Sequence, residues 1–217
     1  MNNDMKHKAD DAWRAEEDDQ TPEDEPLKVW PFFAVALAWF LALNITWVQV
    51  VPVMAYPGGL TASAVLGVVA PQWVQKAELK NGELLVDTSF KKMVPDAQGK
   101  PTERFISVDV QARGMTYGMT LFLALIISAA RSGWWLRIWP GIALLMVVQG
   151  FCMAGAALSL AVRAVGSAAE LGITPWQFNA FNVLYFQCVL VLPTLAPVMV
   201  WLWLDWPVVA RLFGLKK

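Results

Sequence analysis

Four uncharged apolar runs constrain the fold of this chain more than any other feature of its sequence. They cover about residues 30–51, 114–130, 138–162 and 180–204. The first run, WPFFAVALAWFLALNITWVQVV, is long enough to cross the hydrocarbon core of a bilayer, which takes roughly 20 helical residues. Because backbone polar groups in lipid must find partners within the segment, each run predicts a helix. We therefore expect an α-helical membrane protein with four transmembrane helices.

The charge and the reactive side chains exclude several functions. The net charge is −1 and only 16% of the residues are charged, so a basic nucleic-acid-binding protein is excluded and no nucleic acid partner is expected. The one histidine, His7, precedes the first run, and Cys152 and Cys188 lie inside apolar runs. These residues supply neither a His-based metal site nor a Ser-His-Asp triad, and apolar surroundings disfavour thiolates. We expect no cofactor and no enzymatic activity.

Residues 1–28 form a separate acidic region. It holds ten acidic and four basic residues and almost no apolar side chains, so it cannot bury a core and is predicted to be disordered. Two roles stay open for this tail: a solvated leader, or a docking segment for a basic partner.

Residues 57–113 separate the first run from the second. The sequence Tyr-Pro-Gly-Gly at residues 56–59 predicts a helix break, which would end the first transmembrane helix (29–56). The apolar stretch Leu60–Trp73, about 14 residues long, is too short to span a bilayer. It predicts an interfacial helix that lies along the membrane surface.

Alternating apolar residues predict a small β module after this stretch. Asn81-Gly82 favours the two-residue type I′ turn of a hairpin, because both positions of that turn have positive φ angles. Residues 77–79 and 84–90 alternate on either side of the turn, residues 93–102 predict a loop, and residues 105–111 alternate again. The resulting three-stranded sheet would need support from neighbouring elements to be stable.

Basic residues indicate the orientation in the membrane. Arg131 and Arg137 bracket the short connection between the second and third runs, and residues 211–217 contain three more bases. Short cytoplasmic loops carry an excess of Lys and Arg, so this connection and the C-terminus are predicted to be cytoplasmic. With four spans the N-terminus is cytoplasmic too, and the β module is extracytoplasmic. Residues 114–217 then hold transmembrane helices 2–4 and a basic C-terminal tail.

Three sets of residues are candidates for binding a partner. Small residues on one stripe of the third run allow another helix to approach closely, and two prolines predict a kink in the fourth run. Two adjacent lysines at the mouth of the loop can attract anionic lipid head groups or an acidic partner. Internal packing explains the stripe equally well, and a solvated loop explains the lysines. The candidates are Lys91, Lys92, Gly150, Ala154, Ala157, Ala161, Pro193 and Pro197.

Polar side chains within the runs are few. No charged residue lies in the middle of a run, which argues against a proton-coupled transporter. The polar residues are predicted to hydrogen-bond between helices, and the alternative is a shared polar site that binds a partner helix; they are Asn44, Thr46, Gln49, Gln149 and Gln187. Asp205 follows the fourth run among tryptophans, where water is expected to reach it.

An ordered series of motifs resembles the exosortase-associated integral membrane proteins, most closely the exosortase H-associated type. An apolar stretch ends in proline (AVLGVVAPQWV), a hairpin follows (ELKNGELLVDTSF), a strand runs into a second span (VDVQARGMTYGMTLFLALIISA), and a late span is proline-rich (VLVLPTLAPVMVWLWL). The acidic tail departs from this pattern. The resemblance implies a bacterial inner-membrane protein beside a membrane protease-transpeptidase that sorts proteins to the cell surface. Exosortases themselves use Cys, Arg and His, so the resemblance does not imply catalysis.

We therefore expect a non-enzymatic inner-membrane accessory subunit that engages a membrane partner, an exosortase or its substrate, within the lipid bilayer. The alternative is a structural subunit of another membrane complex, such as a secretion or energy-transducing assembly. A third class, a membrane enzyme with a site at the external face, would have to use charged residues of the β module. These are Glu78, Glu83, Asp87, Asp109 and Arg113, most of which the alternation places on a solvated strand face.

Overall fold

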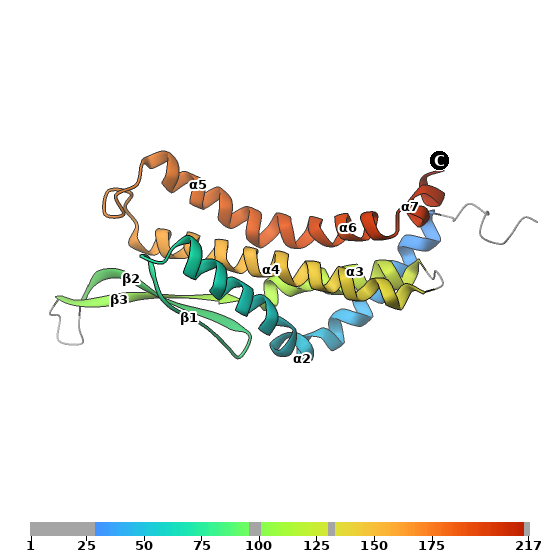
Figure 1. The fold of residues 1–217 in the computed structure, drawn as a ribbon, viewed down its shortest axis with the longest axis horizontal. Coiled ribbons are helices and arrows are strands. Elements are labelled where there is room, and N and C mark those ends of the chain that lie inside the picture. The colour runs from blue at the N-terminus through green and yellow to red at the C-terminus, as the bar shows by residue number, and fades with distance from the viewer. Residues whose placement is uncertain (1–28, 96–100, 130–132, 215–217) are drawn as a thin grey trace, which may run out of the picture.

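The computed structural model describes residues 29–95, 101–129 and 133–214. The predicted acidic tail, Arg131 and the two C-terminal lysines lie outside the described residues. Figure 1 shows an elongated molecule whose helices run roughly along its long axis. A small sheet lies beside one half of the long helix formed by residues 134–165. The elements are α2 (Val29–Val69), β1 (Val74–Lys80), β2 (Glu83–Pro95), β3 (Pro101–Gln111), α3 (Arg113–Ser128), α4 (Trp134–Val165), α5 (Pro175–Phe186), the π-helical segment η1 (Gln187–Val191), α6 (Leu192–Leu204) and α7 (Trp206–Phe213).

Three helices of the described residues are long and apolar enough to cross a membrane. They are α2, α4 and the continuous helix Pro175–Leu204, which comprises α5, η1 and α6. The second predicted span forms α3, which is apolar but has only 16 residues. At 1.5 Å per residue such a helix is about 24 Å long, less than the roughly 30 Å hydrocarbon core. The structure therefore confirms a mostly helical membrane protein with a small sheet, and three of the four expected spans have the required length.

The predicted helix break at residues 56–59 is wrong. Helix α2 continues through Pro52 and Pro57, and Figure 1 shows it changing direction along its length. Each proline removes one backbone donor, which bends a helix without having to end it. The two glycines serve close packing instead of a turn: a Cβ on Gly58 would lie 3.1 Å from Cδ of Gln149, and one on Gly59 would lie 2.9 Å from a methyl of Leu79. The stretch expected to form a separate interfacial helix is mostly the C-terminal arm of α2.

The β module has the predicted hairpin. The three strands are antiparallel in the order β1-β2-β3, and Lys80 pairs with Glu83 around the turn. Asn81 and Gly82 have φ angles of 53° and 82°, as a type I′ turn requires. Strands β2 and β3 are longer than predicted, because the ladder extends to a pairing of Pro95 with Pro101. Prolines are tolerated at strand ends, where no ladder donor is needed.

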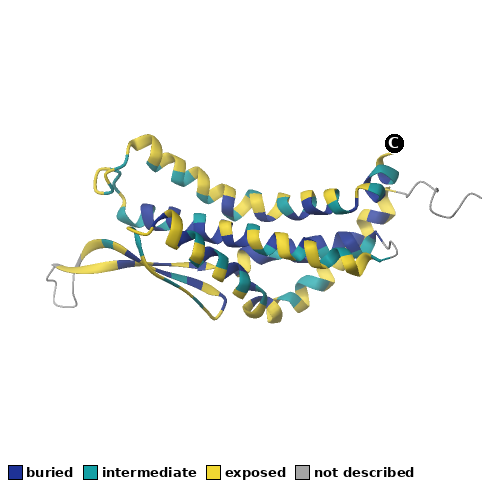
Figure 2. Cartoon of the chain, viewed as in Figure 1, coloured by how far each residue is buried: buried dark blue, intermediate teal, exposed yellow. Residues whose placement is uncertain are grey.

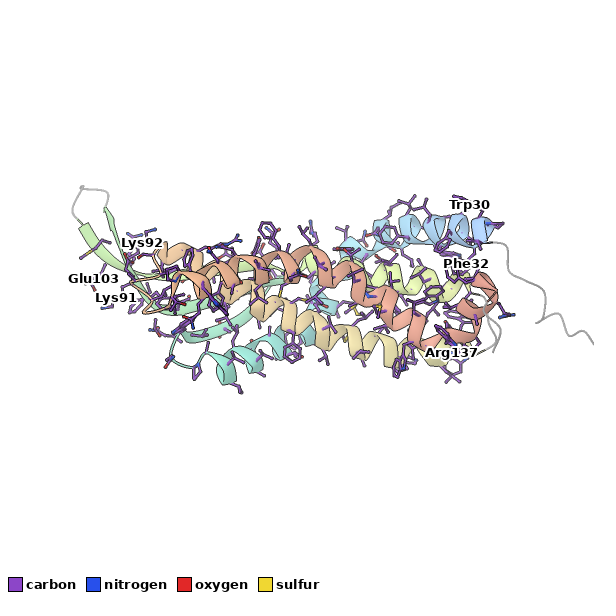
Figure 3. The ribbon with its side chains drawn as sticks, turned by 90° about the horizontal axis from the view of Figure 1, so that it is seen from above. Trp30, Phe32, Lys91, Lys92, Glu103 and Arg137 are labelled. Atoms are coloured by element: carbon purple, nitrogen blue, oxygen red, sulfur yellow. The ribbon has the colours of Figure 1, made fainter. Side chains whose placement is uncertain are left out.

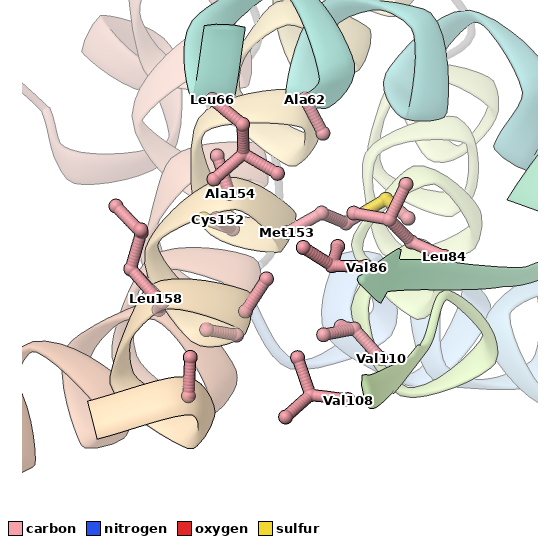
Figure 4. Packing of buried hydrophobic residues seen from close by; sticks show 14 of the residues in the cluster. Ala62, Leu66, Leu84, Val86, Val108, Val110, Cys152, Met153, Ala154 and Leu158 are labelled. Carbon is pink, nitrogen blue, oxygen red and sulfur yellow. The ribbon is translucent and has the colours of Figure 1, made fainter. Parts of the chain in front are cut away.

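The buried residues form two clusters, which α4 connects (Figure 2). The first, here called the sheet core, packs the apolar face of the sheet against the C-terminal arm of α2 and the second half of α4 (Figure 4). The second, here called the bundle core, joins the N-terminal arm of α2 to α3, α6 and α7 around residues such as Phe122 and Trp201. Leu145 of α4 belongs to the bundle core and Met153 to the sheet core. Helix α4 is thus the common spine of both halves.

Candidate partner-binding surface

Lys91 and Lys92 lie on β2, close to the free end of the β2–β3 hairpin (Figure 3). Successive strand residues point to opposite faces of a sheet, and these two side chains have different partners. Lys91 Nζ lies 2.9 Å from Oε2 of Glu103 and 5.6 Å from the centroid of the Phe105 ring. Lys92 Nζ donates a hydrogen bond to the carbonyl oxygen of Ala164, at 3.2 Å. The two lysines therefore do not act as one pair of like charges.

A β-bulge sets the direction of this end of the hairpin. The pairing of β2 with β3 shifts register between Asp87 and Lys91. The buried hydroxyl of Thr88, inside the shift, donates to the carbonyl of Ile106 at 2.6 Å. Bulges bend a strand and redirect its side chains, so the register shift determines which lysine faces α4.

Three basic side chains lie near the C-terminal end of α4. Lys92 reaches Ala164, and the neighbouring Arg163 donates from Nε to Oδ1 of Asn182 at 2.7 Å and stacks on the Tyr185 ring at 4.2 Å. Cations are favoured at this end of a helix by its dipole. Arg104 pairs with Lys92 across the strands and so shares its face of the sheet. Among the described residues, neither Lys92, Arg104 nor Arg163 has a carboxylate partner. We call these three residues the basic end of the module.

The stripe of small residues on α4 is buried within the chain itself. Gly150, Ala154, Ala157 and Ala161 all face the sheet core or its edge, and a Cβ on Gly150 would lie 2.4 Å from Cβ of Thr61. The close approach that the stripe permits is therefore made by α2. A role of these four residues in binding a partner stays a prediction.

Pro193 and Pro197 are buried against α3. A Cβ on Gly118 would lie 2.5 Å from the carbonyl oxygen of Pro193 and 2.8 Å from Cγ of Pro197. The helix widens to the π-helical segment η1 just before Pro193, where the amide of Leu192 bonds to the carbonyl of Gln187. Figure 1 shows the helix changing direction between α5 and α6, as the prolines predict.

Asp205 is the residue that sequence reasoning placed wrongly. Only 1% of it is exposed, and Oδ1 accepts a hydrogen bond from Nη1 of Arg137, so the expected access to water is wrong. Its carbonyl also accepts from the amides of Val208 and Val209 in the first turn of α7. Helix α7 and the ion pair together cover the carboxylate. The sequence did offer a signal for this pair: Arg137 lies near the start of one apolar run and Asp205 at the end of another, and these two ends meet when the two helices are antiparallel.

The family described as exosortase H-associated membrane protein matches residues 26–208 of the 217. The chain belongs to this family. No curated protein and no solved structure matches it. The match begins near the end of the acidic tail and ends within α7, so it includes the sheet core and all of the bundle core except Val209 and Leu212, and it confirms the resemblance drawn from the motifs.

The charged residues considered for a catalytic site in this exosortase H-associated chain lie at its surface. Glu78 pairs with Lys76 at 2.8 Å, and this hydrogen bond and charge raise the pKa of Lys76, which stays protonated at neutral pH. Asp87 accepts from the hydroxyl of Ser107 at 2.6 Å. Glu83, Asp109 and Arg113 are also exposed, so all five residues considered for catalysis are solvated. In the described part of the chain, no three His, Cys, Asp or Glu side chains gather as metal ligands.

Of the polar residues predicted to join helices, Asn44 does so. Its amide donates to the hydroxyl of Thr120 on α3 at 3.1 Å and to the carbonyl of Phe40 at 2.8 Å. Thr46 donates to the carbonyl of Leu43 in its own helix, at 3.0 Å, and Gln49 and Gln187 are exposed. Gln149 is buried between α2 and α4, and its carbonyl oxygen has no hydrogen-bond partner in the described residues.

Proposed function

We propose that this chain is a non-enzymatic accessory subunit of the bacterial inner membrane that engages an exosortase or that enzyme's substrate. The family supports association with an exosortase. The observation that carries the proposal is the shared spine: α4 belongs to the bundle core and to the sheet core. A recognition module built this way is held in a fixed orientation relative to the membrane.

The proposed topology has four crossings, with α3 as the short one. Helix α3 packs against α2, α4 and α6, and its Phe122, Leu125 and Ile126 are part of the bundle core. A helix shorter than the hydrocarbon core is accommodated by local thinning of the bilayer. Both termini are then cytoplasmic and the sheet is extracytoplasmic. Figure 3 agrees with this arrangement, because Trp30 and Arg137 lie at the end opposite Lys91 and Lys92.

The proposed recognition surface is the basic end of the module together with Lys91. Lys92 and Arg104 are exposed and carry charge that no described carboxylate balances. Basic residues near an anionic membrane contribute about 1 kcal/mol each, and an acidic partner segment would use the same attraction. Lys91 contributes less, since Glu103 already pairs with it.

Native co-purification in mild detergent tests this function. With an exosortase as the identified partner, the double variant Lys92→Gln/Arg104→Gln should recover much less partner, because two unbalanced charges are removed. The matched control is Lys76→Gln/Lys80→Gln, which removes two exposed charges from β1 and should leave recovery unchanged. Both variants are compared at equal amounts of membrane-inserted protein.

Three outcomes would contradict the proposal. Recovery of a large unrelated complex without an exosortase would favour a structural subunit of another assembly. Equal recovery with both double variants would remove the basic end from recognition. Loss of the partner on deletion of residues 1–25, with no effect of Lys92→Gln/Arg104→Gln, would place recognition in the acidic tail.

A further inference from the structure

The two edges of the sheet have different surroundings. Helix α2 lies beside the edge strand β1: the hydroxyl of Ser63 donates to the carbonyl of Ala77 at 3.2 Å, and a Cβ on Gly59 would lie 2.9 Å from a methyl of Leu79. Strand β3 forms the opposite edge, and no further strand of the described residues pairs with it. Of the two edges, β3 is thus the one available for pairing with another chain.

The register of β3 determines which of its main-chain groups point away from the sheet. In an antiparallel ladder, alternate residues direct both their N–H and their C=O toward the neighbouring strand. The amide of Ala112 donates to the carbonyl of Gly82 at 3.1 Å, and the carbonyl of Ile106 accepts from a hydroxyl of β2. Even-numbered residues in this part of β3 therefore face β2. The residues whose amides and carbonyls point to the open edge are Ser107, Asp109 and Gln111.

These outward groups are unpaired and accessible. In the described part of the chain, no hydrogen bond outside the β2–β3 ladder satisfies them, and all three side chains are exposed. Phe105, earlier on the same strand, is 55% exposed. Helix α4 covers the other face of the strand, toward which Val108 and Val110 point (Figure 4). A row of unpaired main-chain groups on an edge strand is a template for pairing with another extended chain.

The charge beside this edge indicates the chemistry of the chain that it fits. Arg104 lies on β3 itself, and Lys92 shares its face of the sheet. Neither has a carboxylate partner among the described residues, whereas Lys91 is already paired with Glu103. Because alternate side chains of an added strand lie on one face, carboxylates at alternate positions would lie beside the two unbalanced charges. An acidic segment therefore fits this edge better than a basic one.

We infer that β3 binds an extended acidic segment of the membrane partner by β-strand addition. The main chain of that segment exchanges hydrogen bonds with Ser107, Asp109 and Gln111, and its carboxylates contact Lys92 and Arg104. In this mode of recognition the main-chain bonds supply affinity and the alternate side chains supply specificity. The identity of the partner rests on the proposed function, whereas the open edge and its charge do not.

Amide hydrogen exchange of the full-length protein in lipid nanodiscs, read at single-residue resolution, tests this inference. The probe is an octapeptide of alternating threonine and glutamate, which places its carboxylates on one face of a strand. With this peptide, the outward amides of Ser107, Asp109 and Gln111 should exchange several-fold more slowly. The inward amides of Val108 and Val110 provide the internal control, because the ladder should protect them with or without peptide.

The matched octapeptide of alternating threonine and lysine should give much less protection at the same concentration. Unchanged exchange of the outward amides with the acidic peptide would overturn the inference, and equal protection by both peptides would overturn its charge preference. Protection without peptide that rises with protein concentration would assign the edge to a second copy of this chain, which would also overturn it.

The variants Asp109→Pro and Asp109→Ala form a matched pair for the partner itself. Both remove the same charge, but only proline removes the outward N–H, and proline is tolerated on an edge strand where that group faces away from the ladder. Asp109→Pro should recover several-fold less exosortase than Asp109→Ala, at equal amounts of membrane-inserted protein. If Asp109→Pro fails to fold, the exchange measurement on the unaltered protein still decides.

The two proposals fail in different ways. Equal recovery of an exosortase with folded Asp109→Pro and Asp109→Ala would overturn strand addition and leave the proposed function intact. Recovery of no exosortase even with the unaltered protein would contradict the proposed function, while exchange with the acidic octapeptide would still decide whether β3 accepts a strand.

Discussion

At the residue scale, the ion pair of Arg137 and Asp205 is asymmetric. The side chain of Asp205 is 2% exposed and that of Arg137 is 25% exposed. A long arginine side chain can redirect its charged end to water, whereas the aspartate cannot. Loss of Arg137 would leave the buried aspartate charge without a partner, whereas loss of the Asp205 charge would leave an arginine that can reach water.

We predict that Arg137→Leu destabilises the protein more than Asp205→Asn does. Breaking a buried pair so that a charge remains buried costs about 3–5 kcal/mol, whereas Asp205→Asn leaves a cation that can reach water and should cost about 1–3 kcal/mol. Apparent melting temperatures in detergent measure the order. The double variant should lie above Arg137→Leu alone. A melting temperature of Arg137→Leu equal to that of the exposed-site control Lys80→Gln would contradict the prediction.

At the element scale, two helical glycines, Gly150 of α4 and Gly67 of α2, differ in the space around them. Gly150 is the point at which α4 meets α2, and a Cβ there would lie 2.4 Å from Cβ of Thr61 and 2.9 Å from the carbonyl of Gly58. Gly67 also lies within a helix, but a Cβ added there would meet no atom within 4 Å. The contrast shows which glycine the fold requires and which it only tolerates.

The substitutions Gly150→Ala and Gly67→Ala should therefore change stability in opposite directions. Overpacking at residue 150 should cost about 1–3 kcal/mol, while alanine at residue 67 should gain up to about 1 kcal/mol through helix propensity. Thermal unfolding and protease resistance of the sheet check both signs. Unchanged stability of Gly150→Ala would show that the contact between α2 and α4 is looser than the structure has it.

Sequence patterns predicted some elements well and others poorly, for physical reasons. The Asn81-Gly82 turn and the alternation of the strands depend on local backbone preferences, which short sequences reveal. The Gly58-Gly59 pair resembled a break, yet its role comes from Gln149 and Leu79, which are distant in sequence. The same limit applies to the candidate surface: adjacency of Lys91 and Lys92 was visible, but the bulge that separates their partners depends on pairing with β3.

At the scale of the whole molecule, the side of the membrane occupied by each segment depends on α3. If α3 crosses, residue 81 and residue 132 lie on opposite sides, and both termini are cytoplasmic. If α3 does not cross, the three longer helices place residues 81 and 132 on the same side and the termini on opposite sides. The 16 residues of this helix thus decide the topology.

Single cysteines in a Cys152→Ala/Cys188→Ala background test the four-crossing topology. With a membrane-impermeant maleimide, Asn81→Cys should be labelled in cells with a permeabilised outer membrane, because the four-crossing topology makes this residue extracytoplasmic. Ser132→Cys and Lys217→Cys should be labelled only after the inner membrane is opened. Labelling of Lys217→Cys while the inner membrane is intact would contradict the four-crossing topology and indicate that α3 does not cross the membrane.

The shared spine also fixes the order in which the chain can mature. The strands between residues 74 and 111 leave the ribosome before α4, yet α4 supplies the far side of the sheet core. A three-stranded sheet this small is not stable without packing on another element. Until the segment around Met153 has been synthesised, the strands can pack only against the C-terminal arm of α2, which supplies part of the sheet core. The β module therefore reaches its full stability late in biogenesis, and a chain that stops after α3 holds strands whose apolar face has no cover from α4.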